Sequence, residues 1–384
     1  MTTPQNYHPS RDALPKTTHT SAIKVVLAFA AILIATFLGL IVLALIGFET
    51  GLVGLLIGFV AATIPVPLYV LLVLWIDRYE AEPLWMLASA FFWGALVAVF
   101  IAVLFNTASS LIVASVTDSM QAGEVFGAVI SAPIVEETAK AFILFIFFFW
   151  KKDEFDGVID GIMYAAMVGL GFAMTENIQY YGRAVLSGST VPVFILRGMF
   201  APFSHPLFTS MTGIGLGLAR QSSSTFVKLL LPIVGLLSAI FMHSIWNGSA
   251  ALFGGLGFIV TYVVIMVPAF AIMLVIIFLA LRREGRLVGE FLRPDFERGV
   301  LSQQEYQQLC SIRGRMSASY TAFSQGGMTH WRMCRQFNQT ASELAFHRSR
   351  VARGITSGDE NAREEAYRSA LQHLSAQLRQ QRPS

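Results

Sequence analysis

Residues 132–150, APIVEETAKAFILFIFFFW, form an apolar run that is interrupted by Glu136, Glu137 and Lys140. The run is long enough to cross a bilayer, for which about 20 residues are needed. A charged side chain at the centre of a membrane helix costs about 3 kcal/mol or more, so such groups are rare and face a partner or a water-filled site. The stretch therefore predicts a transmembrane helix that carries a functional site.

The composition of the whole chain agrees with a membrane protein. Of 384 residues, 55% are hydrophobic and only 13% are charged, against about 25% charged in soluble domains. Apolar runs recur from Ile23 to Arg282, and the chain then becomes polar. We predict an all-α fold, a polytopic helical bundle in the lipid bilayer. The net charge of +3 is too small to indicate a nucleic-acid partner.

The apolar runs predict about eight transmembrane helices and three domains. The domains are a polar cytoplasmic N-terminal segment (1–22), a transmembrane domain (23–282) and a short helical cytoplasmic tail (283–384). Connections rich in Lys and Arg alternate with connections that almost lack them, and Arg183 is the exception. By the positive-inside rule, both termini are cytoplasmic. The expected spans are 24–48, 52–76, 85–116, 125–150, 157–181, 192–219, 229–252 and 255–281.

Small residues recur every four positions in two of these spans. Such spacing lets two helix backbones approach closely and predicts that the fifth and sixth spans lie at the centre of the bundle. The residues are Gly157, Gly161, Ala165 and Gly169 in the fifth span and Gly213 and Gly217 in the sixth.

The tail carries signals of helix starts and stops. The pairs Ser302 with Glu305 and Thr340 with Glu343 have the spacing of a capping box, and Gly354 fits the end of a helix. Both cysteines of the chain, Cys310 and Cys334, lie here. In a cytosolic tail they are expected to be free thiols.

Further polar residues lie within the predicted spans. Lys140 follows Glu136 by four residues and Glu137 by three, so an ion pair on one helix face explains part of the cluster. One lysine does not satisfy two glutamates, and the second needs a proton, a metal or another partner. The other candidates are Glu176, Asn177, Arg197, His205, His243 and Asn247. Each of these has a structural alternative as a hydrogen-bonded residue of the bundle interior.

The depth of these residues favours a common site. With helices of alternating direction and about 1.5 Å per residue, Glu136, Glu137 and His205 lie near the middle of the membrane. His243 lies somewhat outside the middle, and Glu176 lies nearer the outer boundary. Acids and imidazoles from three helices can therefore meet around water.

Two carboxylates and two imidazoles support two kinds of chemistry. They can deprotonate a water and protonate a leaving amine, or two histidines and one carboxylate can bind zinc with an open position. The candidate zinc ligands are His205, His243 and Glu137. Asn247 or Arg197 could donate hydrogen bonds to a developing oxyanion. The sequence leaves the choice between a metal and metal-free activation open, and it contains no HExxH motif.

Four motifs in order resemble the PrsW-type intramembrane proteases, which belong to a wider group with the CAAX prenyl endopeptidases. The motifs are EETAK (136–140), FAMTEN (172–177), HPLFTSMTG (205–213) and HSIWN (243–247), and the likeness covers about residues 70 to 250. The resemblance implies that the catalytic residues are Glu136, Glu137, Glu176, His205, His243 and Asn247. In this interpretation the two adjacent glutamates activate water, and the histidines assist or bind a metal.

The resemblance implies an intramembrane endopeptidase of the bacterial inner membrane. Its substrate would be a membrane-anchored protein, cut in or next to its transmembrane segment. PrsW-type proteins are associated with site-1 cleavage of anti-sigma factors. Two other hypotheses remain: a proton- or cation-coupled transporter, and a scaffold that binds single-span proteins without cleaving them. The absence of an internal repeat between the two halves favours the enzyme over the transporter.

Overall fold

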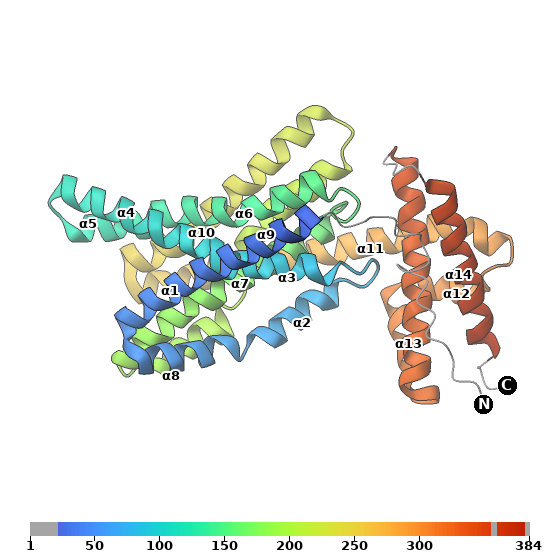
Figure 1. Ribbon diagram of the computed structural model, residues 1–384, viewed down its shortest axis with the longest axis horizontal. Coiled ribbons are helices and arrows are strands. Elements are labelled where there is room, and N and C mark those ends of the chain that lie inside the picture. Colours follow the sequence, from blue (N-terminus) through green and yellow to red (C-terminus); the bar gives the residue numbers. More distant parts are fainter. Residues whose placement is uncertain (1–21, 355–358, 381–384) are drawn as a thin grey trace. The chain divides into compact units, whose positions relative to one another are not determined.

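The computed structural model describes residues 22–354 and 359–380, and all regular elements within these ranges are helices (Figure 1). The predicted all-α class is confirmed. The predicted segment 1–22 lies outside the described residues, except for its last residue. The α-helices are α1 (Ala22–Thr63), α2 (Val66–Ile76), α3 (Leu84–Phe92), α4 (Val99–Thr117), α5 (Met120–Phe126), α6 (Ala132–Trp150), α7 (Val158–Leu186), α8 (Thr190–Phe194), α9 (Ser204–Gln221), α10 (Thr225–Thr261), α11 (Val267–Glu297), α12 (Gln303–Leu309), α13 (Ile312–Ala352) and α14 (Glu360–Gln380).

Four short π-helices continue or precede these α-helices. In a π-helix the backbone hydrogen bonds close over five residues rather than four, so the side chains that follow change direction. The π-helices are η1 (Trp93–Ala98), η2 (Gly127–Ser131), η3 (Ile195–Phe200) and η4 (Tyr262–Met266). Two of them, η2 and η3, come shortly before predicted site residues.

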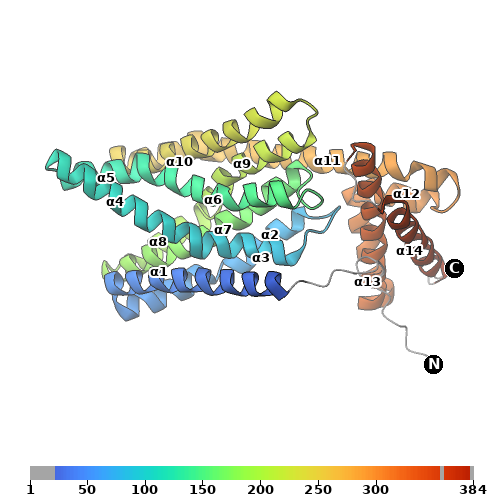
Figure 2. The same ribbon diagram turned by 45° about the horizontal axis from the view of Figure 1, so that its top comes forward.

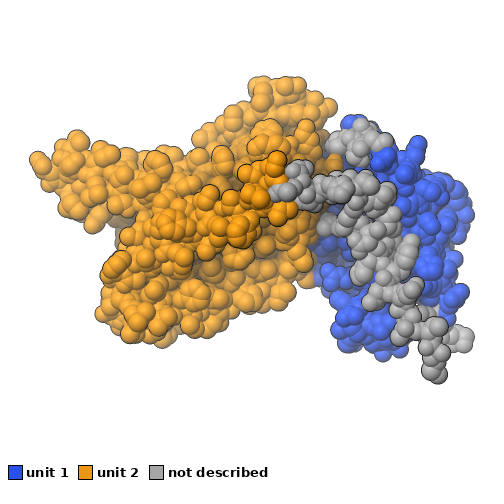
Figure 3. Space-filling model, in the orientation of Figure 1, with its two compact units in different colours: residues 1–21, 77–81, 278–384 blue, residues 22–76, 82–277 orange. Residues whose placement is uncertain are grey.

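The chain divides into two compact units, which Figure 3 shows in different colours. The membrane unit comprises residues 22–76 and 82–277. The tail unit comprises the chain from Phe278 onward together with the internal loop Asp77–Ala81, which connects α2 to α3. The loop is thus part of the tail unit although both helices that it connects belong to the membrane unit.

Within residues 22–354 and 359–380, five segments are long and apolar enough to cross a membrane, so the predicted count of about eight spans is not confirmed. Two of the five, Val25–Ile76 and Thr225–Glu297, contain 52 and 73 residues, far more than the 20 or so that one crossing needs. Within them the backbone turns at Gly51 (φ 70°) and Gly254 (φ 62°), a conformation that glycine adopts without strain. Figure 2 shows the chain reversing its direction in both places.

Helix α7 forms the centre of the membrane unit, and most of its residues are buried. A Cβ atom on Gly161 would lie 2.1 Å from the carbonyl oxygen of Gly213 in α9, and one on Gly213 would lie 2.0 Å from that of Gly161. The two backbones therefore touch at glycines, which confirms the close approach predicted from the small residues. By contrast, α1 exposes large apolar side chains along its length, among them Ile23, Phe37 and Phe48, a surface suited to lipid.

The tail unit confirms two of the three predicted helix signals. Ser302 and Glu305 form a capping box at the start of α12, with the Ser302 N–H donating to Glu305 Oε2 at 2.7 Å. Gly354 follows the end of α13 with φ 76°. The prediction for Thr340 and Glu343 is wrong, because both residues lie within α13. A capping-box spacing also occurs by chance within continuous helices.

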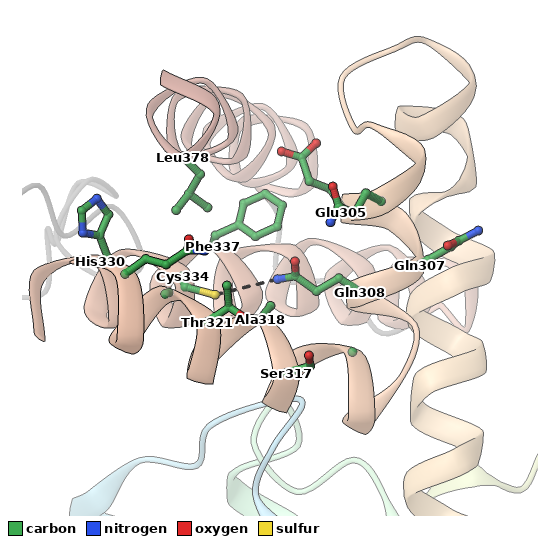
Figure 4. Close-up of a pocket in the computed structure, with 14 residues that line it drawn as sticks. Glu305, Gln307, Gln308, Ser317, Ala318, Thr321, His330, Cys334, Phe337 and Leu378 are labelled. Atoms are coloured by element: carbon green, nitrogen blue, oxygen red, sulfur yellow. Dashed lines mark hydrogen bonds between the residues drawn. The ribbon is translucent and has the colours of Figure 1, made fainter. Parts of the chain in front are cut away.

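A cavity of about 570 Å³ lies among α12, α13 and α14 (Figure 4). Its lining is rich in amides and hydroxyls and includes Gln308 and Cys334, and the close-up shows the Gln308 amide facing the Cys334 sulfur at 3.9 Å. Gln308 Nε2 also donates to Asn338 Oδ1 at 2.9 Å. Cys334 and Cys310 are free thiols, as expected.

Arg315 on α13 is buried and binds backbone carbonyls. Its guanidinium donates to Leu309 O at 2.9 Å and to Arg78 O at 3.3 Å, and it lies 4.3 Å above the Tyr79 ring. Burial lowers the pKa of Arg315 to about 10. Arg350 adds an ion pair to Glu80 of the same loop at 2.7 Å. The tail unit thus holds the α2–α3 loop through two arginines.

We expect Arg315→Met to loosen the tail unit. The substitution leaves the bound carbonyl oxygens without their donor in a buried environment, which costs about 1–3 kcal/mol. The variant should be cut by thermolysin within residues 278–384 faster than the wild type, as measured by loss of a C-terminal tag. Arg313→Met is the matched control, since Arg313 is exposed two residues away. Equal resistance of both variants would show that Arg315 does not hold the unit.

Candidate active site

Three helices bring five buried polar side chains of the membrane unit together. Helix α6 supplies Glu136, Glu137 and Lys140, whose spacing of three and four residues places them on one helix face. His205 comes from α9 and His243 from α10. All five side chains are buried, and Glu137 and Lys140 have no exposed surface.

His205 lies in the first turn of α9, directly after the break that follows the π-helix η3. Pro206 fits this turn because the first N–H groups of a helix have no helical partner. Thr209 follows His205 by one turn and therefore lies on the same face of α9. This start of α9 presents both side chains to α6.

Glu137 has partners at both of its carboxylate oxygens. Oε1 accepts from Lys140 Nζ at 2.9 Å and lies 3.1 Å from His243 Nδ1. Oε2 accepts from the Thr209 hydroxyl at 2.9 Å. These contacts from α6, α9 and α10 fix the carboxylate and orient the His243 ring.

Lys140 provides a positive charge at the centre of the cluster. Besides Glu137, its ammonium lies 3.4 Å from Glu136 Oε2 and 3.0 Å from His205 Nδ1. It also lies 3.7 Å above the centre of the Phe172 ring. The predicted ion pair within α6 is therefore present, and Lys140 contacts both glutamates at once.

Glu176 on α7 belongs to the same cluster. Its Oε2 atom lies 2.9 Å from His205 Nε2 and 2.5 Å from the Arg197 guanidinium. Arg197 also donates to Asn177 Oδ1 at 2.6 Å. The depth argument placed Glu176 nearer the outer boundary, but the structure brings it into contact with the site through His205.

Glu136, His205 and His243 could together hold a metal ion. One ligand atom from each lies within 4.8 Å of the others, and imidazole nitrogens with a carboxylate oxygen are a donor set that zinc accepts. Each histidine also has a carboxylate at one ring nitrogen, Glu176 for His205 and Glu137 for His243. Metal-binding histidines commonly have such a partner. The residues present therefore fit a metal ion. The sequence predicted Glu137 as the carboxylate ligand, but the structure groups Glu136 with the two histidines.

Asn247 lies outside this cluster. Its side-chain amide donates to the carbonyl oxygen of Ala128 at 3.0 Å, in the π-helix η2. Because a π-helix shifts the backbone hydrogen bonds, it can leave a carbonyl oxygen for a side chain to satisfy. The other predicted catalytic residues, Glu136, Glu137, Glu176, His205 and His243, do lie together.

Asn106 and Thr209 are polar residues of the site that the sequence analysis did not single out. Asn106 on α4 donates from Nδ2 to Glu136 Oε1 at 3.3 Å. The sequence does mark Asn106, because it is an amide within an apolar span, where a polar group without a hydrogen-bond partner is costly. Thr209 gives no comparable signal, because threonine is common in membrane helices and can bond to its own backbone.

A cavity of about 730 Å³ opens onto the cluster. Its walls come from α1, α4, α6 and α7, and they include Glu136 and Glu176. Apolar side chains such as Val42, Ile46 and Val99 form most of the remaining surface. Glu49 and Arg183, which form an ion pair and are both partly exposed, also line it. The cavity thus connects two acidic residues of the cluster with an apolar surface.

Comparison with known proteins gives one family. The family described as PrsW family intramembrane metalloprotease matches residues 82–273, a range that contains all the cluster residues. Protease PrsW of Geobacillus kaustophilus is 39% identical over 145 residues, which is 38% of this chain and 58% of that protein. Protease PrsW of Oceanobacillus iheyensis is 30% identical over 167 residues, or 43% and 70%. That of Bacillus subtilis is 32% identical over 147 residues, or 38% and 62%.

These alignments cover less than two thirds of the Geobacillus and Bacillus proteins and somewhat more of the Oceanobacillus protein. No solved structure matches the chain. The matched family range ends at residue 273 and does not include the tail from Phe278 onward.

Proposed function

The chain belongs to the PrsW family of intramembrane metalloproteases, and from this premise we propose that it is an intramembrane peptidase. It hydrolyses a peptide bond in or next to the transmembrane segment of a membrane-anchored protein. The observation that carries the proposal is the group of Glu136, His205 and His243, which could bind a metal. One of these residues, Glu136, also lines the cavity. A buried set of this kind, next to a cavity with apolar walls, suits water activation beside an apolar substrate.

We assign the metal-binding role to Glu136, His205 and His243. An ionised carboxylate only accepts hydrogen bonds, so the ring N–H of His205 faces Glu176 and that of His243 faces Glu137. The other nitrogen of each ring then keeps its lone pair, and that of His205, Nδ1, lies 3.0 Å from the Lys140 ammonium, which a bound metal would have to displace. A zinc ion held by these residues would supply Lewis-acid activation of the water and the carbonyl.

In the reaction, the water oxygen attacks the scissile carbonyl carbon, and the Glu136 oxygen that does not hold the metal accepts the proton that the water loses. The carbon–nitrogen bond then breaks, and Glu136 passes this proton to the leaving amine. Glu137 has partners at both oxygens, so we assign it to positioning His243 and Lys140 rather than to accepting that proton. Glu176 orients His205.

The substrate class and the orientation are further parts of the proposal. The resemblance supports site-1 cleavage of a membrane-anchored anti-sigma factor in the inner membrane of a bacterium. The distribution of Lys and Arg supports about eight crossings with both termini in the cytoplasm. The turns at Gly51 and Gly254 support counting two crossings in each long segment.

Metal content measured together with cleavage tests the proposal. We expect the protein purified in detergent without chelator to hold close to one zinc ion, and His205→Ala and His243→Ala to lose both the zinc and the cleavage of a single-span reporter protein. His330→Ala, in the tail unit, should keep both. Cleavage by a zinc-free wild type would refute the metal assignment and leave water activation by glutamate and histidine. Absence of both zinc and cleavage would favour the transporter or scaffold hypothesis.

A further inference from the structure

Peptide hydrolysis needs a hydrogen-bond donor for the oxygen that becomes negative in the tetrahedral intermediate. The two donors considered from the sequence have other partners. The Asn247 amide donates to Ala128 O, and the Arg197 guanidinium contacts Glu176 and Asn177. Neither Asn247 nor Arg197 lines the cavity that Glu136 lines.

Asn106 is an amide that does line this cavity. Its Nδ2 atom lies 3.3 Å from Glu136 Oε1, so the donor lies beside the carboxylate that accepts the proton of water. An amide nitrogen carries two N–H groups, and the bond to Glu136 uses one of them. A carbonyl oxygen bound by the second would lie close to a water held by Glu136.

Two serines fix the orientation of the Asn106 amide. Ser131 Oγ donates to Asn106 Oδ1 at 3.1 Å, which identifies the oxygen end of the amide and directs the nitrogen end toward Glu136. Ser131 is buried and lies 2.6 Å from the hydroxyl of Ser109, one turn from Asn106 on α4. The amide is thereby held before a substrate arrives, as a preorganised donor requires.

The apolar part of the cavity wall favours such a donor. A peptide bond of a transmembrane segment becomes accessible to attack when its helix unwinds locally, and its carbonyl oxygen then loses its helical partner. Between Val42, Ile46 and Val99, an unpaired carbonyl would have a large desolvation cost. Asn106 can provide the missing hydrogen bond.

We propose that Asn106 is a catalytic residue whose side-chain amide binds the scissile carbonyl oxygen, and that Ser131 positions it. This proposal rests on the proposed peptidase function and extends it by naming the group that stabilises the oxyanion. The occupant of the cavity is the locally extended end of the substrate's transmembrane segment.

Kinetics of the purified protein in proteoliposomes test the proposal, with a single-span reporter protein that the wild type cleaves. We expect Asn106→Ala to lower kcat by about 10²–10³-fold, the usual loss for one oxyanion donor, and to leave KM nearly unchanged. Asn106→Leu, which keeps a similar size but removes the donor, should behave in the same way. Ser131→Ala should lower kcat by a smaller factor. Thr117→Val is the matched control, because Thr117 is exposed on α4 and does not line the cavity, and it should retain the wild-type kcat.

Zinc content and the pH profile of kcat/KM separate this role from a structural one. Because the amide also donates to Glu136, its loss is expected to shift the pH profile in either case. If Asn106 only oriented Glu136, its loss would reduce the bound zinc, or the wild-type kcat would return at the pH optimum of the variant, and either result would overturn the proposal. A change confined to KM would also overturn it. Wild-type kcat in both Asn106 variants, together with an inactive Glu136→Gln, would refute the role of Asn106 and leave the peptidase function standing. No cleavage by the wild type would refute the peptidase function itself.

Discussion

Glu136→Gln is expected to lower the rate of cleavage by about 10³-fold or more, the upper part of the range for loss of a general base. Glutamine has nearly the same size and keeps one oxygen, which can accept either from Lys140 in the place of Oε2 or from Asn106 in the place of Oε1, so the helix packing should survive. The amide cannot accept the proton that the attacking water loses. The rate is measured on the single-span reporter protein in proteoliposomes.

Glu124→Gln is the control for Glu136→Gln, because Glu124 is exposed on α5, outside the cluster. It should cleave at the wild-type rate. The thermal unfolding of Glu136→Gln in detergent should match that of the wild type, which would show that the fold is intact. Cleavage by Glu136→Gln within tenfold of the wild-type rate would exclude Glu136 as the base.

Lys140→Met is expected to have the largest effect on stability. Methionine fills a similar volume, but Glu137 then loses its cation at 2.9 Å and Glu136 loses the same cation at 3.4 Å. Removing one partner of a buried ion pair costs about 3–5 kcal/mol because the remaining charge stays buried. The variant should unfold at a clearly lower temperature in detergent, or fail to accumulate as a folded protein.

A double variant separates the charge effect from a packing effect. If the cost comes from unpaired carboxylates, Lys140→Met combined with Glu137→Gln should be more stable than Lys140→Met alone, because one of the two charges is also removed. A packing defect would instead leave the double variant as unstable as the single variant or more so. Wild-type stability of Lys140→Met would show that neither glutamate depends on this cation.

The sequence predicted those parts of the site that depend on helical spacing. The contacts of Lys140 with both glutamates follow from separations of three and four residues. The contact of Gly161 with Gly213 follows from small residues at four-residue spacing. Depth along the spans correctly brought Glu136 near His205, since regular helices advance by a constant rise per residue.

The remaining parts depend on features that spacing does not reveal. Asn247 follows His243 by one helical turn, yet its amide contacts the π-helix η2, whose position the apolar pattern does not mark. The rise per residue predicts a position for Glu176 nearer the outer boundary than His205, yet the two side chains meet. Glu136, and not Glu137, groups with the two histidines. Glu137 is instead held by Thr209 and Lys140, and no local sequence pattern predicts these contacts together.

The position of the α2–α3 loop in the tail unit has a consequence for biosynthesis. The loop Asp77–Ala81 leaves the ribosome about 200 residues before the tail that begins at Phe278. At about 5–20 residues per second, this interval lasts about 10 to 40 s. During that time α3 to α10 are made while Arg315 and Arg350 do not yet exist. A nascent chain or a truncated protein that ends before Arg315 therefore presents Tyr79 and Glu80 to the surrounding solution and to chaperones.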